Sequence, residues 1–529
     1  MCRAQEPAAA GAPHLEHAPD TFPVYAIDVS GVTRLEAGEL ERIVYPFTGE
    51  TKTGSDIENA RKAIQAAYAA KGLEAVVVEI PTQTSELFAQ GVVQIDVHEA
   101  PVGRVRVVDS RYHALSVVRK QVPSVAEGEP LDLRALQRDI EGANRFPDRS
   151  VSPSFRAGQV PGTLDVDLRV DDHLPLHASV EVNNDHSPNT TSLRTTAAAR
   201  YTNLWQAGHS LSFTYSVAPE KRSESEVYSA SYTLPFMSSR WSMMLYGYKS
   251  NSNVAALGGT NVLGNGYQIG LRGVYRLPSQ GNLQTISFGP DFKNFKQDIF
   301  VGGKPAGSAP ILYLPVVAEY SFATASENSS FDATLGATFG LRTIKRTNCV
   351  VTEFGQPCEQ VDQFRDRSAN SNENFVHLNL GLNYSRSTKS DIVGVLRING
   401  QFADSPLVTN EQYGVGGFSS IRGYLQSEAV GDSGVNGSIE LRSPSLSPML
   451  GKLVDDLRFY AFADGGYAHV RAALPDQTSD FSLVSVGGGV RVRLFDFFTG
   501  EVLVGVPLLD GPNSRKGDPR LTFQARGEF

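Results

Sequence analysis

Beyond residue 176 the chain alternates between apolar and polar side chains, in segments of about 10 to 14 residues. The segment 391–402 shows the pattern clearly, and the segments 374–385 and 520–529 repeat it. Its even positions are Ile392, Gly394, Leu396, Ile398, Gly400 and Phe402, and its odd positions include Arg397, Asn399 and Gln401. Period-two alternation predicts β-strands with one apolar face, and about 16 such segments can be placed between residues 177 and 529.

Two all-β folds share this alternation, a soluble β-sandwich and a transmembrane β-barrel. Strand length separates them, because sandwich strands centre near ~5 to 6 residues whereas a tilted strand needs ~9 to 11 to cross a bilayer. A closed barrel also satisfies every backbone polar group in lipid, which an open sheet cannot do. We therefore predict a transmembrane antiparallel β-barrel over residues 173–529. Its water-filled interior would hold Arg397, Arg491, Arg493 and Glu501.

Residues 23–172 show a different pattern, in which helical and strand-like segments follow each other twice in the same order. The first unit, 23–100, has strands at 24–29, 75–80 and 92–97 and helices at 37–45 and 55–71. The second unit, 101–172, has strands at 102–108, 151–155 and 163–170 and helices at 114–122 and 131–145. Two successive units in one order indicate tandem small α/β domains.

The longest predicted helix, 55–71, has recognisable signals at both ends. Ser55 and Glu58 have the spacing of a capping box, and Gly72 is placed to end the helix. Its apolar face comprises Ile57, Ala60, Ile64, Ala67 and Tyr68. By contrast, residues 1–22 are rich in Ala, Pro and His, which predicts a disordered N-terminal segment.

Composition narrows the class of protein further. The 529 residues carry a net charge of −9, with an isoelectric point near 5.7, so no general basic surface exists to attract nucleic acid. No run approaches the ~18 to 20 apolar residues of a spanning helix. The mean hydropathy of −0.21 is typical of a soluble protein. A transmembrane barrel gives the same value, because only every second strand residue meets lipid.

The chain has 3 cysteines, and their positions bear on the compartment. Cys349 and Cys358 lie in a polar stretch, residues 345–370, and we predict that they form a loop disulfide in an oxidising compartment. Two free buried thiols are the alternative, and Cys2 has no partner. Residues 1–7 contain no apolar core of a signal peptide, so either the secretion signal is missing or the start is misassigned.

Two short motifs carry the candidate chemistry. Ile421-Arg422-Gly423-Tyr424 lies in a long turn-rich stretch, 404–434, and Phe462-Ala463-Asp464-Gly465-Gly466 lies inside a strand-like run. Alternation turns Phe462 and Asp464 toward the barrel interior, beside glycines that leave room for a loop. The planar fork of Arg422 can meet a carboxylate through two hydrogen bonds. A surface Arg422 and an Asp464 solvated by pore water are the alternative.

These residues, with Glu411-Gln412-Tyr413-Gly414-Val415-Gly416-Gly417, closely resemble the signature of a known family. It is the two-partner secretion transporter (TpsB) family, the haemolysin secretion/activation proteins typified by ShlB, FhaC and HecB. Ile421 stands where the family motif has Val. The resemblance implies two periplasmic POTRA domains before a sixteen-stranded barrel in the bacterial outer membrane. It also implies that the loop 404–434 folds into the lumen and that Arg422 pairs with Asp464.

The resemblance further implies an activity. The POTRA domains would capture a secreted partner exoprotein, and the barrel would pass it outward. The physical route would be β-augmentation, for which the edges 76–80 and 102–108 are both candidates. A helix that plugs the pore is not expected, because Pro7, Pro13 and Pro19 interrupt the N-terminal segment. An outer-membrane assembly factor and a plain diffusion porin remain the alternative functions.

Several motifs point to other chemistry, but without the partners that this chemistry needs. Gly431-Asp432-Ser433-Gly434 copies the nucleophile neighbourhood of trypsin-like proteases, yet no His lies in a matching context. The 10 histidines, among them His98 and His377, show no metal-site spacing, and no phosphate-binding loop is present. We therefore predict a protein that is not an enzyme and has no metal or cofactor.

The chain ends on Phe529, the last residue of an alternating strand. Outer-membrane barrels commonly end on an aromatic residue, and we interpret Phe529 as a signal for the barrel assembly machinery. A chance aromatic is the alternative, since 9% of the residues are aromatic. Outer-membrane lipid is the remaining partner that a barrel of this kind requires.

Overall fold

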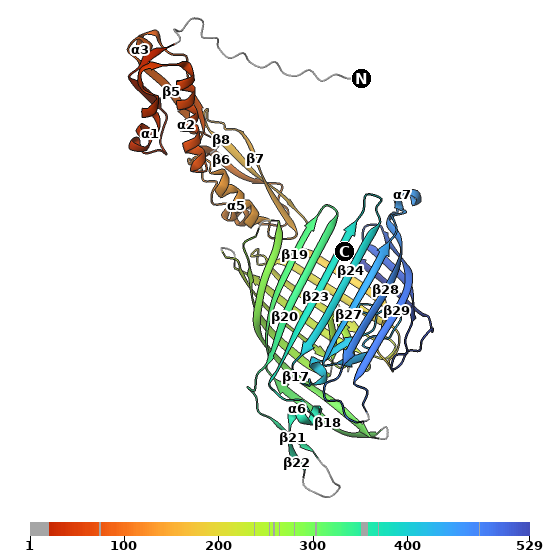
Figure 1. Cartoon of the computed structure of the whole chain (residues 1–529). Helices are drawn as coiled ribbons and strands as arrows, with labels where there is room; N and C mark the ends of the chain where they lie inside the picture. The colour runs from red at the N-terminus through yellow and green to blue at the C-terminus, as the bar shows by residue number, and fades with distance from the viewer. Residues whose placement is uncertain are drawn as a thin grey trace. The chain divides into compact units, whose positions relative to one another are not determined.

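The computed structural model describes residues 21–529 except 74–75, 237–238, 253, 258–259, 264, 280, 302–303, 351–357, 369 and 476. The chain forms two compact units, Met1–Leu174 and Pro175–Phe529 (Figure 1). Most of the predicted disordered segment, 1–22, lies outside the described residues. Phe22 already belongs to strand β1 (Phe22–Val24), so ordered structure begins one residue before the predicted boundary.

The N-terminal unit begins with a small α/β fold built in the predicted order. Its main elements are β2 (Ala26–Ser30), α1 (Ala37–Val44), α2 (Gly54–Ala70), β4 (Val77–Glu79) and β5 (Val92–His98). Shorter elements are η1 (Tyr45–Phe47), β3 (Gly49–Lys52), which pairs with β1, and α3 (Ser85–Ala89). The sheet has the order β2-β5-β4, with β2 parallel to β5 and β4 antiparallel to it. Helix α2 buries Ile57, Ala60, Ile64 and Tyr68, which confirms most of its predicted apolar face.

The start of α2 differs from the prediction. Thr53, not Ser55, is the N-cap, and the capping box pairs it with Asp56, whose carboxylate accepts the Thr53 N–H at 2.8 Å. The predicted partner Glu58 instead accepts from Arg61 at 2.7 Å. The spacing fits both pairs, and the strand β3 decides between them by bringing the chain in extended form up to Lys52. At the other end, Gly72 has φ +83°, as a helix stop requires.

A second α/β fold repeats this topology. It consists of β6 (Val102–Val108), α4 (Leu115–Gln121), α5 (Leu133–Ala143), β7 (Arg149–Ala157) and β8 (Leu164–Asp172). The sheet order is β6-β8-β7, again with a parallel pair and an antiparallel pair. Its core includes Val118, Leu136, Val166 and Leu168. The repeat predicted from sequence is therefore a repeat of strand order and direction.

The C-terminal unit is a closed antiparallel barrel of 16 strands. Going round, its strands are β9 (Leu176–Asn183), β10 (Arg194–Leu204), β11 (His209–Val217), β12 (Glu226–Pro235), β13 (Trp241–Ser250), β16 (Asn265–Arg276), β17 (Asn282–Val301), β18 (Lys304–Tyr313) with β19 (Val316–Ser326), β20 (Ser329–Gly340), β23 (Phe375–Ser387), β24 (Val393–Ala403), β27 (Ser433–Arg442), β28 (Val454–His469), β29 (Asp480–Leu494), β30 (Phe498–Pro507) and β31 (Arg520–Glu528). Strands β18 and β19 count as one because they pair with successive parts of β17. The β31–β9 pair closes the ring.

The two faces of the barrel wall differ as the alternation predicts. Ile439 is 65% exposed and Leu441 is 58% exposed, whereas Glu440 between them is only 1% exposed. The apolar positions therefore face outward and the polar positions face inward. No helix in the described part of the chain is long and apolar enough to span a membrane.

Several connections between barrel strands carry structure of their own. One contains the hairpin β21 (Thr347–Val350) and β22 (Glu359–Asp362) and the helix α6 (Gln363–Arg367). A disulfide joins Cys349 to Cys358 across this hairpin, with Cα atoms 5.2 Å apart. Another, between β24 and β27, contains η2 (Thr409–Glu411) and the two-stranded pair β25 (Tyr413–Val415) and β26 (Ala429–Gly431). A third contains α7 (Ser447–Leu450), and the pair β14 (Val254–Leu257) and β15 (Thr260–Leu263) follows β13.

Candidate functional site

Arg422 and Asp464, the two residues singled out by the motifs, are in direct contact. The Nε and Nη2 atoms of Arg422 donate to the two carboxylate oxygens of Asp464 at 2.8 and 2.9 Å. The Arg422 backbone N–H donates to the same carboxylate at 3.0 Å. Arg422 is 4% exposed and Asp464 is 2% exposed. The pair is therefore bidentate and desolvated, which is the strong form of this interaction.

A second carboxylate, which the sequence did not point to, completes the site. Arg422 Nη1 donates to Glu440, and Nη2 donates to the Ser438 hydroxyl at 2.9 Å. Both residues lie on β27, where Ser438 is the cross-strand partner of Asp464. Arg442 Nε donates to the other Glu440 oxygen at 2.7 Å. Glu440 thus links Arg422 to Arg442.

Aromatic rings cover the face of the Arg422 guanidinium. Its central carbon lies 3.7 Å from the centroid of the Phe462 ring and 5.9 Å from that of Tyr460. Such stacking favours arginine over lysine, because the planar group can make ring contact and hydrogen bonds at once. Phe462 of the strand motif therefore contributes to holding the arginine of the loop motif.

The other three residues of the loop motif each contact the barrel wall. Ile421 is fully buried, in a cluster with Ala468 and Leu483. The Tyr424 hydroxyl lies 2.8 Å from the Leu509 carbonyl and 3.0 Å from the Val484 carbonyl, and these two acceptors share its single proton. Gly423 has φ +94°, a conformation that a glycine adopts without strain.

The two glycines of the strand motif have different surroundings. A Cβ atom added to Gly466 would lie 2.5 Å from the Cδ1 of Ile421, so this glycine leaves room for the loop, as predicted. A Cβ atom added to Gly465 would meet only the Leu483 carbonyl, at 4.0 Å. The prediction that glycines make space for the loop therefore applies to Gly466 and not to Gly465.

The same loop has a second polar contact with the wall, at its N-terminal side. Glu411 accepts hydrogen bonds from Lys293 Nζ at 2.6 Å and from the Tyr313 hydroxyl at 2.5 Å. His377 Nε2 lies 3.3 Å from the other carboxylate oxygen. Glu411 was part of the recognised sequence motif, but its partners on β17, β18 and β23 were not predicted. His377 therefore faces inward.

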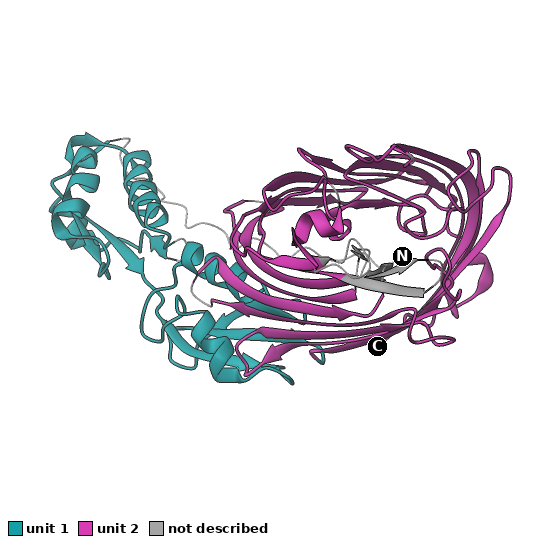
Figure 2. Ribbon diagram, turned by 90° about the horizontal axis from the view of Figure 1, so that it is seen from below, with its two compact units in different colours: residues 1–174 teal, residues 175–529 magenta. Residues whose placement is uncertain are grey.

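Further carboxylates fix the loop to neighbouring connections. Glu428 accepts from the Ser514 N–H at 2.8 Å, and Asp185 accepts from the Phe418 N–H at 3.2 Å. Contacts with several different strands and connections place residues 404–434 within the ring of strands, which Figure 2 shows in magenta. The arrangement can hold a loop across the interior, and releasing it requires several buried contacts to break.

The protease-like tetrapeptide 431–434 has a structural role. Asp432 accepts the backbone N–H groups of Leu407 and Arg471 at 2.8 and 2.6 Å. The Ser433 hydroxyl accepts the Ala403 N–H at 3.0 Å. The cross-strand partner of Ser433 is His469, but its Nδ1 is hydrogen-bonded to Asp480 at 2.9 Å. Asp432 and Ser433 thus anchor the end of the loop to neighbouring backbone.

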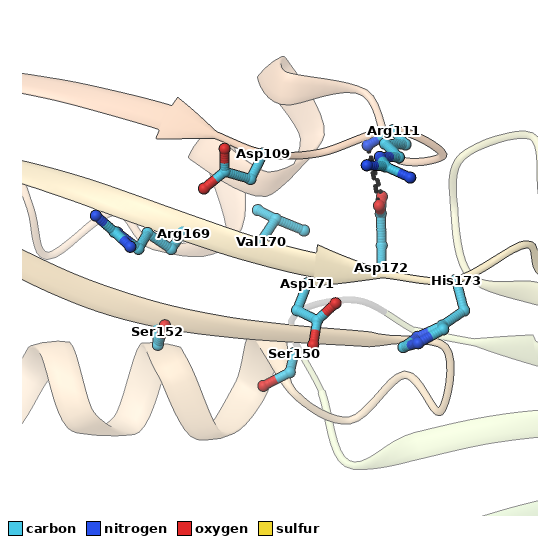
Figure 3. A pocket seen from close by; sticks show the side chains of 9 residues that line it. All are labelled: Asp109, Arg111, Ser150, Ser152, Arg169, Val170, Asp171, Asp172 and His173. Atoms are coloured by element: carbon cyan, nitrogen blue, oxygen red, sulfur yellow. Dashed lines mark hydrogen bonds between the residues drawn. The ribbon is translucent and has the colours of Figure 1, made fainter.

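A cavity of about 670 Å³ lies in the N-terminal unit, at the end of β8 (Figure 3). Its lining includes Asp109, Arg111, Arg169 and Asp171, so it carries both signs of charge and does not select an anion or a cation. Asp172 also lines the cavity and accepts the Arg111 N–H at 2.9 Å. Among the described residues, no group of three or more His, Cys, Asp or Glu side chains is placed to hold a metal ion.

The terminal residue takes part in barrel closure. The N–H and carbonyl groups of Phe529 exchange hydrogen bonds with Ala178 at 2.8 and 2.9 Å, which extends the β31–β9 pairing. Its ring is 69% exposed and stacks on Phe497 at a centroid distance of 5.5 Å. An exposed aromatic at this place is accessible from outside the barrel wall.

Comparison with known proteins settles the family. The model of the haemolysin secretion/activation proteins ShlB/FhaC/HecB matches residues 162–492, and that of the ShlB-type POTRA domain matches residues 22–100. The chain belongs to the ShlB/FhaC/HecB family. It is an outer-membrane transporter of the two-partner secretion type, with its POTRA region in the periplasm. The resemblance drawn from the motifs is thereby confirmed, and the translocator is favoured over the assembly factor.

Individual relatives agree with this assignment. The chain is 22% identical to the outer membrane transporter CdiB of Escherichia coli, over 92% of this chain and 79% of the relative. It is 23% identical to the heme/hemopexin transporter protein HuxB of Haemophilus influenzae, over 90% of this chain and 81% of the relative. Members of this family are secretion proteins and not enzymes.

Solved structures show the same fold. Escherichia coli CdiB superposes with a TM-score of 0.62 at 18% identity, covering 99% of this chain and 93% of that one. BamA from Haemophilus ducreyi, in a form lacking POTRA domains 1–3, gives a TM-score of 0.53 at 14% identity, over 96% of this chain and all of that one (100%). At these identities the likeness describes architecture alone.

Proposed function

We propose that this protein captures one secreted partner exoprotein in the periplasm and exports it through its barrel, with residues 404–434 as the gate. The loop fills part of the interior while Arg422 is bound to Asp464 and Glu440. Export requires the loop to leave this position, because an extended polypeptide and the anchored loop compete for the same space. The gate is therefore a two-state element whose closed state is set by buried charge pairs.

One observation carries the proposal, the burial of the Arg422 network against inward-facing strand residues. Breaking a buried ion pair by removing one partner typically costs ~3 to 5 kcal/mol, because the remaining charge stays uncompensated. Such a contact is strong enough to keep a pore closed at rest. It is also local enough for an arriving client, by offering competing contacts, to shift the equilibrium toward the open state.

The second α/β fold supports a second POTRA domain at residues 101–172, since its sheet order matches that of the first. Two remaining partners belong to the proposal. Outer-membrane lipid would contact the outward apolar band, which includes the exposed Ile439 and Leu441. The barrel assembly machinery would read Phe529, whose exposed ring ends the closing strand. We further propose that folding of the client outside the cell drives export, since no phosphate-binding loop is found in the sequence.

Secretion measurements on gate variants test the proposal. Cells that express this protein together with its exoprotein should release that exoprotein. Arg422→Ala should reduce the release at least tenfold, because a loop without its anchor lets ions leak past but has no defined resting position from which the client can displace it. The barrel of that variant should remain inserted, as judged by heat-modifiable electrophoretic migration. Undiminished secretion by Arg422→Ala would contradict the gate assignment. Depletion that removed outer-membrane proteins broadly, and not one exoprotein, would contradict the transport function itself.

A further inference from the structure

We propose that the client docks by adding a β-strand to the free edge of β2, residues Ala26–Ser30, in the first α/β fold. The inference rests on the proposed capture function and names the surface that performs it. Each three-stranded sheet of the N-terminal unit has two edges, formed by β2 and β4 in one sheet and by β6 and β7 in the other. An edge strand with unpaired N–H and C=O groups is a template for an incoming strand.

The β4 edge is already occupied by side chains of helix α2. The Gln65 amide donates to the Val76 carbonyl at 2.6 Å, and its oxygen accepts the Val78 N–H at 3.2 Å. Arg61 donates to the Val78 carbonyl at 3.3 Å. A side-chain amide carries an N–H donor beside a C=O acceptor, as the backbone of a strand does, so Gln65 stands where a neighbouring strand would pair.

A second glutamine amide, that of Gln83, covers the sheet edge beyond the end of β4. There the backbone of Gln94 on β5 has no strand beside it on the β4 side. The Gln83 amide donates to the Gln94 carbonyl at 3.0 Å, and its oxygen accepts the Gln94 N–H at 2.8 Å. On this side of the first sheet, backbone groups of Val76, Val78 and Gln94 that would pair with an added strand are therefore already bonded. The edge at 76–80, a candidate from the sequence, is not available.

Both edges of the second sheet are covered in part. On β7, Asn144 bonds both the N–H and the carbonyl of Val151, at 2.6 and 3.0 Å, and Pro153 lacks an N–H to donate. On β6, the Glu127 carboxylate accepts the Val105 N–H at 2.9 Å. The Val102 N–H donates to the Glu129 carbonyl at 2.9 Å. The second candidate edge, 102–108, is thus covered over its first half.

The β2 edge, in contrast, has outward backbone groups that no side chain in the described part of the chain covers. The Ala26 N–H donates to the Gly91 carbonyl on the β5 side, at 3.2 Å. Backbone direction alternates along a strand, so Ile27 and Val29 point their N–H and C=O groups away from β5. Within the described part of the chain these groups have no hydrogen-bond partner. Two residues with outward donors and acceptors can form four hydrogen bonds with an added strand.

The side chains at this edge define what kind of strand fits. Ile27 and Val29 lie on the core side of the sheet and are only partly buried, as are Leu40 and Ile43 of α1 in the same core. On the other side Asp28 is exposed, and Asp96 accepts from the Ser30 hydroxyl at 2.7 Å. An added strand therefore gains by alternating apolar residues toward α1 with basic or hydroxyl residues toward Asp28. An extended segment of the exoprotein with this alternation is the occupant.

Disulfide trapping at the edge tests the assignment with the full-length protein in detergent. The probe is a ten-residue peptide of alternating Val and Lys with one central Cys, offered to a chain that carries Cys2→Ser and Asp28→Cys. The matched control replaces Glu79, an exposed acidic residue on the covered edge β4, by Cys. We expect at least tenfold more cross-linked product at position 28 than at position 79. Equal trapping at the two positions would overturn the proposal.

A backbone substitution makes the second measurement. Val29→Pro removes an outward N–H without removing a bond to β5, and Val29→Ala removes the same side chain but keeps the N–H. We expect the peptide to bind Val29→Pro at least tenfold more weakly, and Val29→Ala within about twofold of the unmodified chain. Hydrogen exchange in α2 verifies that the fold is retained. Equal peptide binding by all three proteins would show that the β2 backbone does not dock the strand.

These measurements separate the docking edge from the export function. Peptide trapping does not require export, so Arg422→Ala should trap the peptide normally while releasing at least tenfold less exoprotein. A chain that traps no peptide at β2 but secretes its client would overturn the docking edge and leave the transport function standing. A second copy of this chain is the competing occupant. Disulfide-linked dimers of Asp28→Cys without peptide would assign the edge to self-association and overturn the proposal.

Discussion

Gly423 of the loop and Gly505 of strand β30 lie against each other with no room for a side chain between them. A Cβ atom on Gly505 would lie 2.6 Å from the Gly423 nitrogen, and one on Gly423 would lie 2.9 Å from the Gly505 carbonyl carbon. Both contacts are with backbone, which cannot rotate away as a side chain can. This close approach brings Arg422 and Tyr424, on either side of Gly423, within reach of the wall.

Gly505→Ala should therefore displace the loop while leaving the barrel intact. Overpacking of this kind costs ~1 to 3 kcal/mol, which is enough to shift a closed gate toward its open state. We expect a severalfold rise in single-channel conductance in planar bilayers. Gly394→Ala, on β24 where a Cβ atom meets nothing within 4 Å, is the matched control and should conduct as the unmodified protein does. Unchanged conductance in Gly505→Ala would count against the contact as a closing element.

Arg422 and Asp464 should behave as one unit in a double-mutant cycle. Asp464→Ala should reduce secretion as strongly as Arg422→Ala, at least tenfold, because either change leaves the other charge buried without its partner. The double variant should be little worse than either single variant, since the interaction is lost only once. Quantitative secretion assays of the four proteins provide the measurement. Additive losses would mean that the two residues act separately.

Arg422→Lys separates charge from geometry at the same place. Lysine keeps the positive charge, but it has one donor group and cannot bridge Asp464, Glu440 and Ser438 while stacking on Phe462. We expect the single-channel conductance of Arg422→Lys to lie close to that of Arg422→Ala. The barrel should keep its heat-modifiable electrophoretic migration. If Arg422→Lys instead conducted as little as the unmodified protein, the positive charge alone would be enough to hold the loop in its closed position.

The Arg422 site and the Glu411 site should hold the loop independently. They lie on different strands and share no residue, since Glu411 contacts Lys293, Tyr313 and His377. Glu411→Gln should loosen only the N-terminal side of the loop and raise conductance modestly, by about twofold. Combined with Arg422→Ala, it should open the pore further than either change alone, because contacts without shared partners add. A double variant that conducts no more than Arg422→Ala would show that the two sites do not hold the loop independently.

The sequence predicted part of this site because its residues stand in regular patterns. Asp464 lies on a strand whose alternation turns it inward, and Arg422 lies in a loop motif of known type, so their pairing followed. Glu440 and Ser438 were missed because their contact depends on the register between β27 and β28, where Ser438 is opposite Asp464. Period-two alternation tells which face a residue takes but not which residue lies opposite.

The N-cap of α2 and the covered edges of the two small sheets depend on how neighbouring segments pack, which the sequence pattern does not show. Two capping boxes fit the start of α2, and the position at which β3 ends selected Thr53. The covered edges depended on Gln65 and Asn144, whose amides look like ordinary polar surface residues in the sequence. That these amides bond the backbone of an edge strand is seen only once the position of that strand is known. The fold class was therefore predictable from periodicity, whereas the free docking edge was not.

The periplasmic part of the chain should lose stability in a narrow acid range because of Asp172. Burial alone would raise the pKa of its carboxyl, but the N–H groups of Arg111 and Tyr112 stabilise the charged form and hold the pKa at about 2. A group whose pKa falls on folding stabilises the fold above its ordinary value, here 3.8, and loses that effect as pH falls toward 2. The contribution near neutral pH is of the order of 2 kcal/mol.

Asp172→Asn should therefore speed hydrogen exchange of peptides from residues 101–172 at pH 6 by roughly one order of magnitude or more, because an amide cannot supply two anionic acceptor oxygens. The difference from the unmodified chain should shrink as pH falls from 4 to 2, where Asp172 itself becomes protonated. Asp171→Asn, one residue earlier and exposed, is the matched control and should exchange normally. A difference that stayed constant down to pH 2 would mean that the side chain acts through shape and not through its charge.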